Sequence, residues 1–248
     1  MKKHKNVSVA QLKKEMGELS DLKQAKILQG FFKTGKGDYG EGDIFLGIKV
    51  PVQRKIAQAF RDLSLNDIKG LLESKIHEHR FIALIILIDK YQESDFKNRE
   101  VIFDFYLENS KNINNWDLVD VSAPKILGDY LLNKPRNILY ELAKSQPKAG
   151  LPCAKKNLWQ KRIAIVSTLA FIKDDDFKDT LKISKILLLD ENDLIQKAIG
   201  WMLREVGKRN QEIEEGFLKK NYSRISRVTL KYAIEKFDTK TRNFYLKK

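Results

Sequence analysis

The sequence contains few of the residues that build cross-linked or irregular folds. Its 248 residues include one cysteine, five prolines and thirteen glycines. The single cysteine, Cys153, excludes an internal disulfide framework and a thiolate zinc cage, and we expect an inert thiol because no histidine lies near it in the sequence. This cysteine usage is typical of a reducing, intracellular compartment. The scarcity of glycine and proline favours long regular elements.

Long apolar runs and targeting signals are also missing. The N-terminal stretch 1–16 is basic but lacks the apolar core of a signal peptide. The longest apolar run, FIALIILI at 81–88, is far shorter than the roughly 20 residues that a membrane-spanning helix needs. We therefore expect a soluble, cytoplasmic protein that does not bind a membrane.

Acidic residues are outnumbered by basic ones. The chain has 47 Lys and Arg against 33 Asp and Glu, a formal net charge of +14. Hydrophobic residues make up 42%, which is enough for a sizeable core and too many for a disordered chain. The positive excess favours a polyanionic partner, and on charge alone a solvated lysine-rich surface explains it equally well.

Apolar residues recur at helical spacing along almost the whole chain, and no run alternates as a strand would. The segments form successive helix pairs: 64–74 with 77–91, 94–109 with 116–133, 135–144 with 157–172, 176–189 with 193–208, and 210–220 with 224–237. The period is about 30 to 45 residues, as in two-helix solenoid repeats. The pattern therefore predicts an all-α repeat fold.

The second helices of these pairs begin alike, with a polar and a basic residue followed by small and apolar ones. They read HRFIALIIL (79–87), KRIAIVSTL (161–169), QKAIGWMLR (196–204) and SRVTLKYAI (226–234). One slot holds Arg80, Arg162, Lys197 and Arg227. Stacked repeats would align this slot into a ladder of cations on one face. The alternative is a set of solvated residues at helix starts.

The stretch NNWDLVDVSAP (114–124) places an aromatic residue and two acids at a predicted helix start. Trp116 takes the basic slot, and Asp120 follows one turn later on the same face. This places Asp120 as a lone carboxylate among the cations, which should keep it ionised. Asp117 points elsewhere, where it suits the helix N-terminus and can accept backbone N–H bonds.

Three further motifs fit structural roles better than chemical ones. The glycine-rich stretch 33–43 lacks a preceding strand and the Walker spacing, so we expect a connector, in which Lys33 and Lys36 can reach phosphates. The histidines of HEH (77–79) are two residues apart, unlike a zincin pair, and we expect them to be exposed at a helix start. The acids of DDDF (174–177) precede a helix and should cap it.

Four motifs in order resemble those of bacterial DNA alkylation repair enzymes of the AlkD type, a family of alkylpurine DNA glycosylases. They are FLGIKVP (45–51), WDLVD (116–120), LWQKRIAI (158–165) and IQKAIGWMLRE (195–205). The resemblance runs from about Phe31 to the last repeat. It implies an all-α, right-handed superhelix of HEAT-like two-helix repeats with a basic concave groove, as a single domain over 1–248 with N-terminal capping helices at about 1–50.

The resemblance also implies an activity: hydrolysis of the N-glycosidic bond of N3- or N7-alkylated purines in double-stranded DNA, by a monofunctional glycosylase. We expect no cofactor and no metal. We expect a monomer with no obligate protein partner.

The resemblance assigns roles to individual residues. Trp116 and Trp201 would be aromatic walls, Asp120 the catalytic carboxylate, and Arg162 a contact near the lesion-bearing backbone. The basic residues of the repeats, and not the resemblance, supply the expected phosphate contacts, which are Arg162, Arg80, Lys161, Lys197 and Arg227. Asn115 stands where some members carry another aromatic residue. From the residues alone, Trp201 fits a core position and Asp120 a surface salt bridge with Lys125 or Arg162.

Two other functions are compatible with the sequence. Some relatives on this fold bind DNA, including branched DNA, without glycosylase activity. The alternative function is therefore a non-catalytic DNA-binding HEAT-repeat protein that recognises branched or damaged DNA. A third class is a protein-interaction scaffold, which is the commonest use of such solenoids. The row of basic residues in the repeats is evidence against this class. Assaying purine release from methylated DNA separates the first two.

Overall fold

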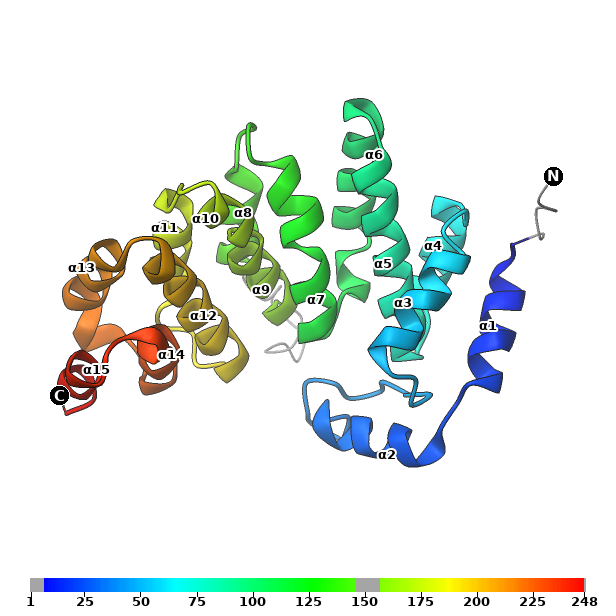
Figure 1. Ribbon diagram of the computed structural model, residues 1–248, viewed down its shortest axis with the longest axis horizontal. Helices are drawn as coiled ribbons and strands as arrows, with labels where there is room; N and C mark the ends of the chain where they lie inside the picture. The colour runs from blue at the N-terminus through cyan, green and yellow to red at the C-terminus, as the bar shows by residue number, and fades with distance from the viewer. Residues whose placement is uncertain (1–6, 146–156, 248) are drawn as a thin grey trace. The chain divides into compact units, whose positions relative to one another are not determined.

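A computed structural model describes residues 7–145 and 157–247. Across these two ranges every regular element is a helix, apart from one bridging residue pair, Ile44 and Ile76. The all-α prediction is confirmed. The chain divides into two compact units, 1–122 (unit 1) and 123–248 (unit 2), whose elements are coloured by position in Figure 1. In the described part of the chain no helix has both the length and the apolar character to span a bilayer.

Unit 1 contains seven α-helices and one 3₁₀ turn among its described residues. They are α1 (Val9–Glu18), α2 (Leu22–Phe31), α3 (Val50–Ala59), α4 (Leu65–Leu72), α5 (His77–Glu93), α6 (Phe96–Glu108), the turn Ser110–Asn112 and α7 (Trp116–Ser122). Side-chain caps start several of them: Ser8 caps α1, Asp21 caps α2, and Ser64 forms a reciprocal capping box with Asp67 at α4.

Helix α5 is the core of unit 1. Its residues Phe81 to Ile88 are each at most 5% exposed, because α3, α4, α6 and α7 pack around it. A helix that is apolar on all sides is stable in water only when it is enclosed in this way. The longest apolar run of the sequence is therefore a buried core helix.

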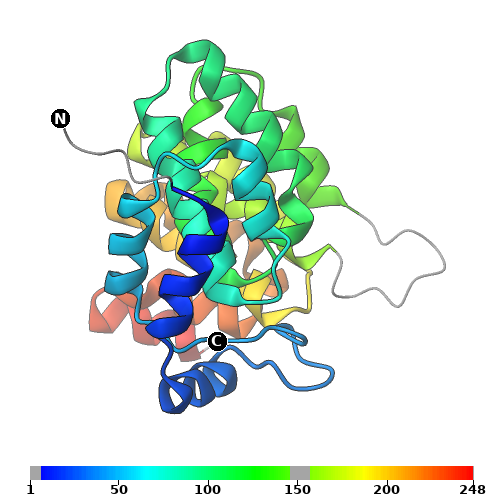
Figure 2. The same cartoon turned by 90° about the vertical axis from the view of Figure 1, so that its right-hand side faces the viewer.

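The loop between α2 and α3 (residues 32–49) contacts the starts of α5 and α2. In Figure 2 this loop and α2 lie below α1. The Ile44 N–H donates to the Lys75 carbonyl (3.0 Å), and the His77 N–H donates to the Ile44 carbonyl (2.8 Å). Gly47 has a φ of +86°, and a Cβ there would lie 2.2 Å from the Asp21 carbonyl oxygen. Only glycine fits this close approach to the start of α2.

Unit 2 has eight described α-helices. A π-helical turn (Pro124–Gly128) precedes α8 (Asn137–Lys144), α9 (Leu158–Ser167), α10 (Leu169–Lys173), α11 (Lys178–Leu187), α12 (Asp193–Arg209), α13 (Gln211–Asn221), α14 (Arg227–Ala233) and α15 (Thr239–Lys247), with 3₁₀ turns at Tyr222–Arg224 and Ile234–Lys236.

The second helices α9, α12 and α14 pack side by side, and the first helices α8, α11 and α13 flank them. Gly200 permits the close α12–α14 contact, since a Cβ there would lie 2.5 Å from the Thr229 carbonyl oxygen. The two-helix repeat is thus present in unit 2.

Two of the predicted second helices are interrupted. In the segment 116–133, α7 ends at Ser122 and a π-helical turn follows from Pro124 to Gly128, because proline lacks the N–H that an α-helical ladder needs. The segment 157–172 divides at Thr168, whose hydroxyl donates to the Ile165 carbonyl (2.7 Å). The right-handed superhelix, its concave groove and the single domain over 1–248 stay predictions.

Candidate functional site

A buried acid–histidine contact fixes the start of α7. Asp117 Oδ1 accepts the Leu118 N–H (2.8 Å), as the sequence predicts for an acid at a helix start. Its second oxygen, Oδ2, lies 2.8 Å from Nε2 of His77, the first residue of α5. His77 is 2% exposed. One carboxylate therefore joins the N-termini of two helices.

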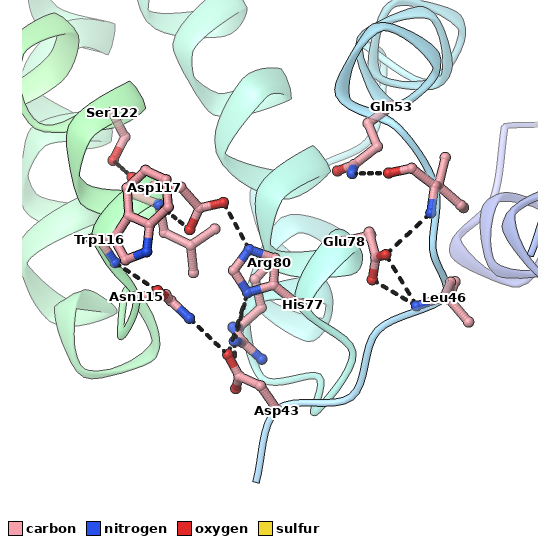
Figure 3. Close-up of polar contacts among 12 residues, drawn as sticks. Asp43, Leu46, Gln53, His77, Glu78, Arg80, Asn115, Trp116, Asp117 and Ser122 are labelled. Carbon is pink, nitrogen blue, oxygen red and sulfur yellow. Dashed lines mark hydrogen bonds and ion pairs between the residues drawn. The ribbon is translucent and has the colours of Figure 1, made fainter. Parts of the chain in front are cut away.

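A second carboxylate completes the network from the α2–α3 loop (Figure 3). Asp43 Oδ2 lies 3.3 Å from His77 Nδ1 and accepts the Asn115 side-chain amide (3.2 Å). Asp43 Oδ1 lies 2.7 Å from Arg80 Nη2. The two acids face two bases, so the group is electrically balanced when His77 is protonated. We call Asp43, His77, Arg80, Asn115 and Asp117 the α7 network.

The charges of the α7 network depend on one another. Burial alone would lower the pKa of His77, but the Asp117 and Asp43 carboxylates beside it raise this pKa to about 8. Burial alone would raise the pKa of Asp43, but hydrogen bonding to His77 and the charge of Arg80 hold it below its usual value. At neutral pH the network is therefore a set of paired ions.

Glu78, next in sequence, holds the adjacent loop. It is fully buried, and its carboxylate accepts the backbone N–H groups of Leu46 (3.0 Å), Gly47 (2.8 Å) and Ile48 (3.3 Å). These bonds fall in the FLGIKVP motif. A carboxylate that accepts several backbone N–H groups fixes the loop that also carries Asp43 and Phe45.

The prediction that His77 and His79 are exposed at a helix start is wrong about exposure. Both are near the start of α5, but they are only 2% and 3% exposed. His79 Nδ1 lies 2.9 Å from Ser74 Oγ, and burial lowers its pKa to about 4. The partners of His77 come from positions 34 and 40 residues away, and the local HEH spacing cannot reveal them. The glycine-rich stretch is a connector that also delivers Asp43.

Trp116 and Asp120 lie one turn apart on α7, and both are partly exposed, as are Asp117 and Val121. The Trp116 ring stacks on Phe32 (centroids 5.2 Å apart, planes at 13°), and Phe31 meets its face edge-on at 5.9 Å. Phe32 in turn stacks on Phe45 (4.9 Å). Between Trp116 and Asp120, Leu118 and Val119 are fully buried. The predicted common face of Trp116 and Asp120 is therefore the partly solvated side of α7.

Asp120 lies in the neighbourhood of a buried tyrosine. Tyr106 on α6 is completely buried and shares a hydrogen bond with Ser122 Oγ (2.9 Å). Its pKa is raised, first by burial and further by the negative charge of Asp120. Asp120 is half-buried, so its carboxylate is partly desolvated.

The other two predicted site residues lie in unit 2. Arg162 on α9 is 5% exposed, and its Nη1 donates to the Leu194 carbonyl (2.6 Å) at the start of α12. Trp201 on α12 is partly exposed, and its indole N–H donates to Glu205 Oε1 (3.2 Å). The packing of α9 on α12 brings their two helices together. Their predicted proximity to Asp120 stays a prediction.

The predicted phosphate contacts have unlike surroundings. Arg80 is 3% exposed and belongs to the α7 network. Lys161 pairs with Asp190 (2.8 Å) and Lys197 with Asp193 (2.7 Å). Arg227 is exposed and donates to the Leu246 carbonyl (2.8 Å). The shared slot thus has several structural uses, and its role in DNA binding stays a prediction.

The acidic DDDF motif is used in ion pairs and turns. Asp175 pairs with Arg209 (2.6 Å), and Asp176 pairs with Arg136 and accepts the Lys178 N–H near the start of α11. Over the described ranges no three His, Cys, Asp or Glu side chains are arranged to hold a metal ion. Cys153 lies outside the described residues.

The fold and site define an all-α protein of paired helices whose α7 carries a fixed tryptophan–carboxylate pair. The model of one family, described as DNA alkylation repair enzyme, matches residues 12–237. The chain belongs to the DNA alkylation repair enzyme family, which indicates an enzyme of DNA repair that acts on DNA.

A solved structure supports the fold assignment. The chain is similar to a predicted DNA alkylation repair enzyme from Enterococcus faecalis, with a TM-score of 0.64 and 18% sequence identity. The match covers 89% of this chain and 97% of that one. At this identity the likeness shows the fold alone. No curated protein matches the chain.

Proposed function

We propose that the protein is a monofunctional DNA glycosylase that hydrolyses the N-glycosidic bond of N3- and N7-alkylated purines in duplex DNA. The observation that carries the proposal is the partly exposed Trp116–Asp120 pair on α7, held in place by the α7 network. Membership of the DNA alkylation repair enzyme family supplies the substrate class. The proposed setting is cytoplasmic, and the proposed form is a monomer without a cofactor.

The chemistry of the substrate explains why a carboxylate is suited to the reaction. Alkylation at N3 or N7 makes the purine cationic, so the base leaves as a neutral molecule and needs no general acid. Positive charge develops on the deoxyribose as the bond breaks. A carboxylate close to the sugar stabilises this charge in the transition state, and it can also orient the attacking water.

The position of Asp120 suits that role. A half-buried carboxylate interacts more strongly with a nearby cation than a fully solvated one does, because water screens it less. Unit charges 4 Å apart at an effective dielectric constant of about 20 interact by about 4 kcal/mol. That energy corresponds to a rate factor of about 1,000.

The aromatic residues and Arg162 would act on the nucleotide around the reacting bond. In the proposal, Trp116 and Trp201 pack against the sugar and backbone, exclude water and attract the cationic nucleotide through their ring faces. Arg162 lies near the lesion-bearing backbone. Lys161, Lys197 and Arg227 would contact phosphates at close range, which positions a duplex without reading its sequence, whereas Arg80 is paired with Asp43 inside the α7 network.

The direct test replaces Asp120 by asparagine. We expect Asp120→Asn to reduce single-turnover release of 7-methylguanine from methylated duplex by about 100- to 1,000-fold, because the charge is lost while the shape is kept. Affinity for the duplex should be equal or higher. The matched control is Asp104→Asn, which removes an exposed acid of α6 and should release the base at the wild-type rate.

Equal release by Asp120→Asn and wild type would reject the catalytic role of Asp120. The alternative, a non-catalytic protein that recognises branched or damaged DNA, predicts that wild type itself releases no base while binding junctions or gaps. The same assay with wild-type protein therefore separates the two functions.

A further inference from the structure

The positive charge of the chain is concentrated in unit 2. Residues 1–122 contain 20 Lys and Arg against 18 Asp and Glu, a formal excess of +2. Residues 123–248 contain 27 against 15, an excess of +12. The field that attracts a polyanion therefore originates mainly in unit 2.

Four basic residues of unit 2 line a hollow between the first helices α8 and α11. The hollow has a volume of about 610 Å³. Lys134, Lys178 and Lys182 line it together with Asn133 and Asn137. Its two acids, Asp176 and Asp179, are both paired with Arg136, at 2.5 and 2.7 Å. The lining has four basic residues, the three lysines and Arg136, against two aspartates, so the hollow keeps a formal excess of +2.

A second hollow of about 280 Å³ continues between α11 and α13. Lys182, Lys185 and Lys220 line it with Asn221, Leu181 and Phe217. Lys182 borders both hollows, so the two form one basic strip along the first helices. We call it the α11 strip.

The spacing along α11 suits a phosphate backbone. Lys178, Lys182 and Lys185 are exposed and lie at positions i, i+4 and i+7, which share one helix face. Seven residues of helix rise span about 10 Å, at about 1.5 Å each. That length corresponds to about three base steps of B-DNA at roughly 3.4 Å per phosphate on one strand.

The lysines of the α11 strip differ from the predicted phosphate contacts in their ion pairing. Within residues 7–145 and 157–247, Lys182, Lys185 and Lys220 form no ion pair. By contrast, Lys161 and Lys197 are each paired with an aspartate. A lysine beside a carboxylate adds little net potential at a distance, whereas an unpaired lysine adds its full charge.

The lining identifies the class of partner. Protein–protein interfaces are depleted of lysine at their centres, which speaks against an acidic protein. Lysine and asparagine are among the residues that contact phosphate oxygens of DNA. We propose that the α11 strip is a second nucleic-acid site, which binds the phosphate backbone of another duplex segment independently of its sequence. The proposal does not depend on glycosylase chemistry.

The test is capture of a second duplex. Wild-type protein is saturated with an immobilised, unmodified 30-base-pair duplex, and binding of a fluorescent duplex to that complex is measured from 0.05 to 0.3 M salt. The variant Lys178→Gln/Lys182→Gln/Lys185→Gln should lose about 100-fold or more of this second binding at 0.1 M salt. Its salt slope should fall by about 2.7, since each lost phosphate contact contributes about 0.9.

The matched control removes the same charge from unit 1. Lys55→Gln/Lys69→Gln/Lys97→Gln changes three exposed lysines of α3, α4 and α6, and should capture the second duplex as wild type does. Thermal unfolding checks that both variants are folded. Binding of the first duplex by the α11-strip variant should stay within about twofold of wild type.

Two results would overturn the proposal. One is that wild type captures no second duplex, or that the α11-strip variant captures it equally well. The other is that the variant loses binding to anionic phospholipid vesicles or polyglutamate while capture of DNA is unchanged. Because the duplexes are unmodified, a protein without glycosylase activity would still give a decisive result here.

Discussion

The two units are built from similar helices but use their charges in opposite ways. In unit 1, Asp43, His77, Arg80 and Asp117 pair with one another inside the protein. In unit 2, a formal excess of +12 includes the exposed lysines of α11. In unit 1 the ionic contacts fix one short helix, whereas the proposed use of the charge of unit 2 is to attract a polyanion.

This division has a physical basis. A buried ion pair is costly to break, because each remaining charge is left without water or partner. It therefore holds Trp116 and Asp120 in one position. Exposed lysines are screened by salt and do not fix the position of other side chains. Their summed electric field can still attract an anion from about one Debye length away. Unit 1 is therefore suited to hold catalytic groups in fixed positions, and unit 2 is suited to attract DNA independently of its sequence.

The largest expected effect on stability comes from breaking the α7 network. Asp43→Ala leaves His77 and Arg80 without their shared carboxylate, and we expect the free energy of unfolding to fall by about 3–5 kcal/mol. Asp175→Asn in unit 2 breaks the exposed pair with Arg209, keeps a residue that tolerates the left-handed backbone at this position (φ +59°), and should cause no resolvable change. Denaturant unfolding measures both. Equal losses would contradict the comparison between buried and exposed pairs.

A smaller effect should appear as a pH dependence in unit 1. The folded pKa of His77 is about 8, against 6.5 for an ordinary histidine. Its contribution to stability is fully present below pH 6.5 and is lost as pH rises through 8, at most about 2 kcal/mol. His77→Gln should remove this part of the decline between pH 6 and 9, which unfolding at a series of pH values can measure. An unchanged decline would contradict the ion-paired state of His77.

Unit 2 has its own buried titratable group, which gives the matching test. Glu214 is 1% exposed, and burial, with the nearby Glu215 charge, raises its pKa from 4.5 to about 9. Its stabilising contribution is present below pH 4.5 and is lost as pH rises through 9. Glu214→Gln should therefore flatten the decline of stability between pH 4.5 and 9. An unchanged decline over this range would show that Glu214 is already ionised in the folded protein.

The smallest effect concerns the paired lysine of α12. Asp193→Asn removes the partner of Lys197 and should change the free energy of unfolding by no more than about 0.5 kcal/mol. If Lys197 contacts phosphate, the loss of the Asp193 carboxylate should strengthen that contact, and the salt slope of duplex binding should rise by up to about 0.9. A changed stability with an unchanged slope would assign the pair a structural role alone.

The helix pairs could be predicted because helical periodicity is local. Segments such as 176–189 and 193–208 correspond closely to α11 and α12. The shared face of Trp116 and Asp120 followed from the same periodicity. The apolar pattern did not predict where α7 and α9 end. Pro124 ends the α-helical hydrogen bonding after α7, and the hydrogen bond of the Thr168 hydroxyl interrupts the helix after α9.

The α7 network could not be predicted, because its contacts join residues far apart in sequence. Asp43 and Asn115 are 72 residues apart, and no local spacing links an acid in a glycine-rich loop to a histidine at a helix start. A signal was present in the acid Glu78 beside two histidines, but its partners are backbone N–H groups, which every residue except proline has. Long-range pairing of this kind is visible only once the helices are packed.

The central claim is that α7 of unit 1 carries the chemistry, whereas the α11 strip of unit 2 does not. Single-turnover release of 7-methylguanine at saturating enzyme tests it directly, with Asp120→Asn and Lys178→Gln/Lys182→Gln/Lys185→Gln side by side. We predict a loss of about 100- to 1,000-fold for Asp120→Asn and the wild-type rate for the lysine variant. Wild-type release by Asp120→Asn would contradict the account.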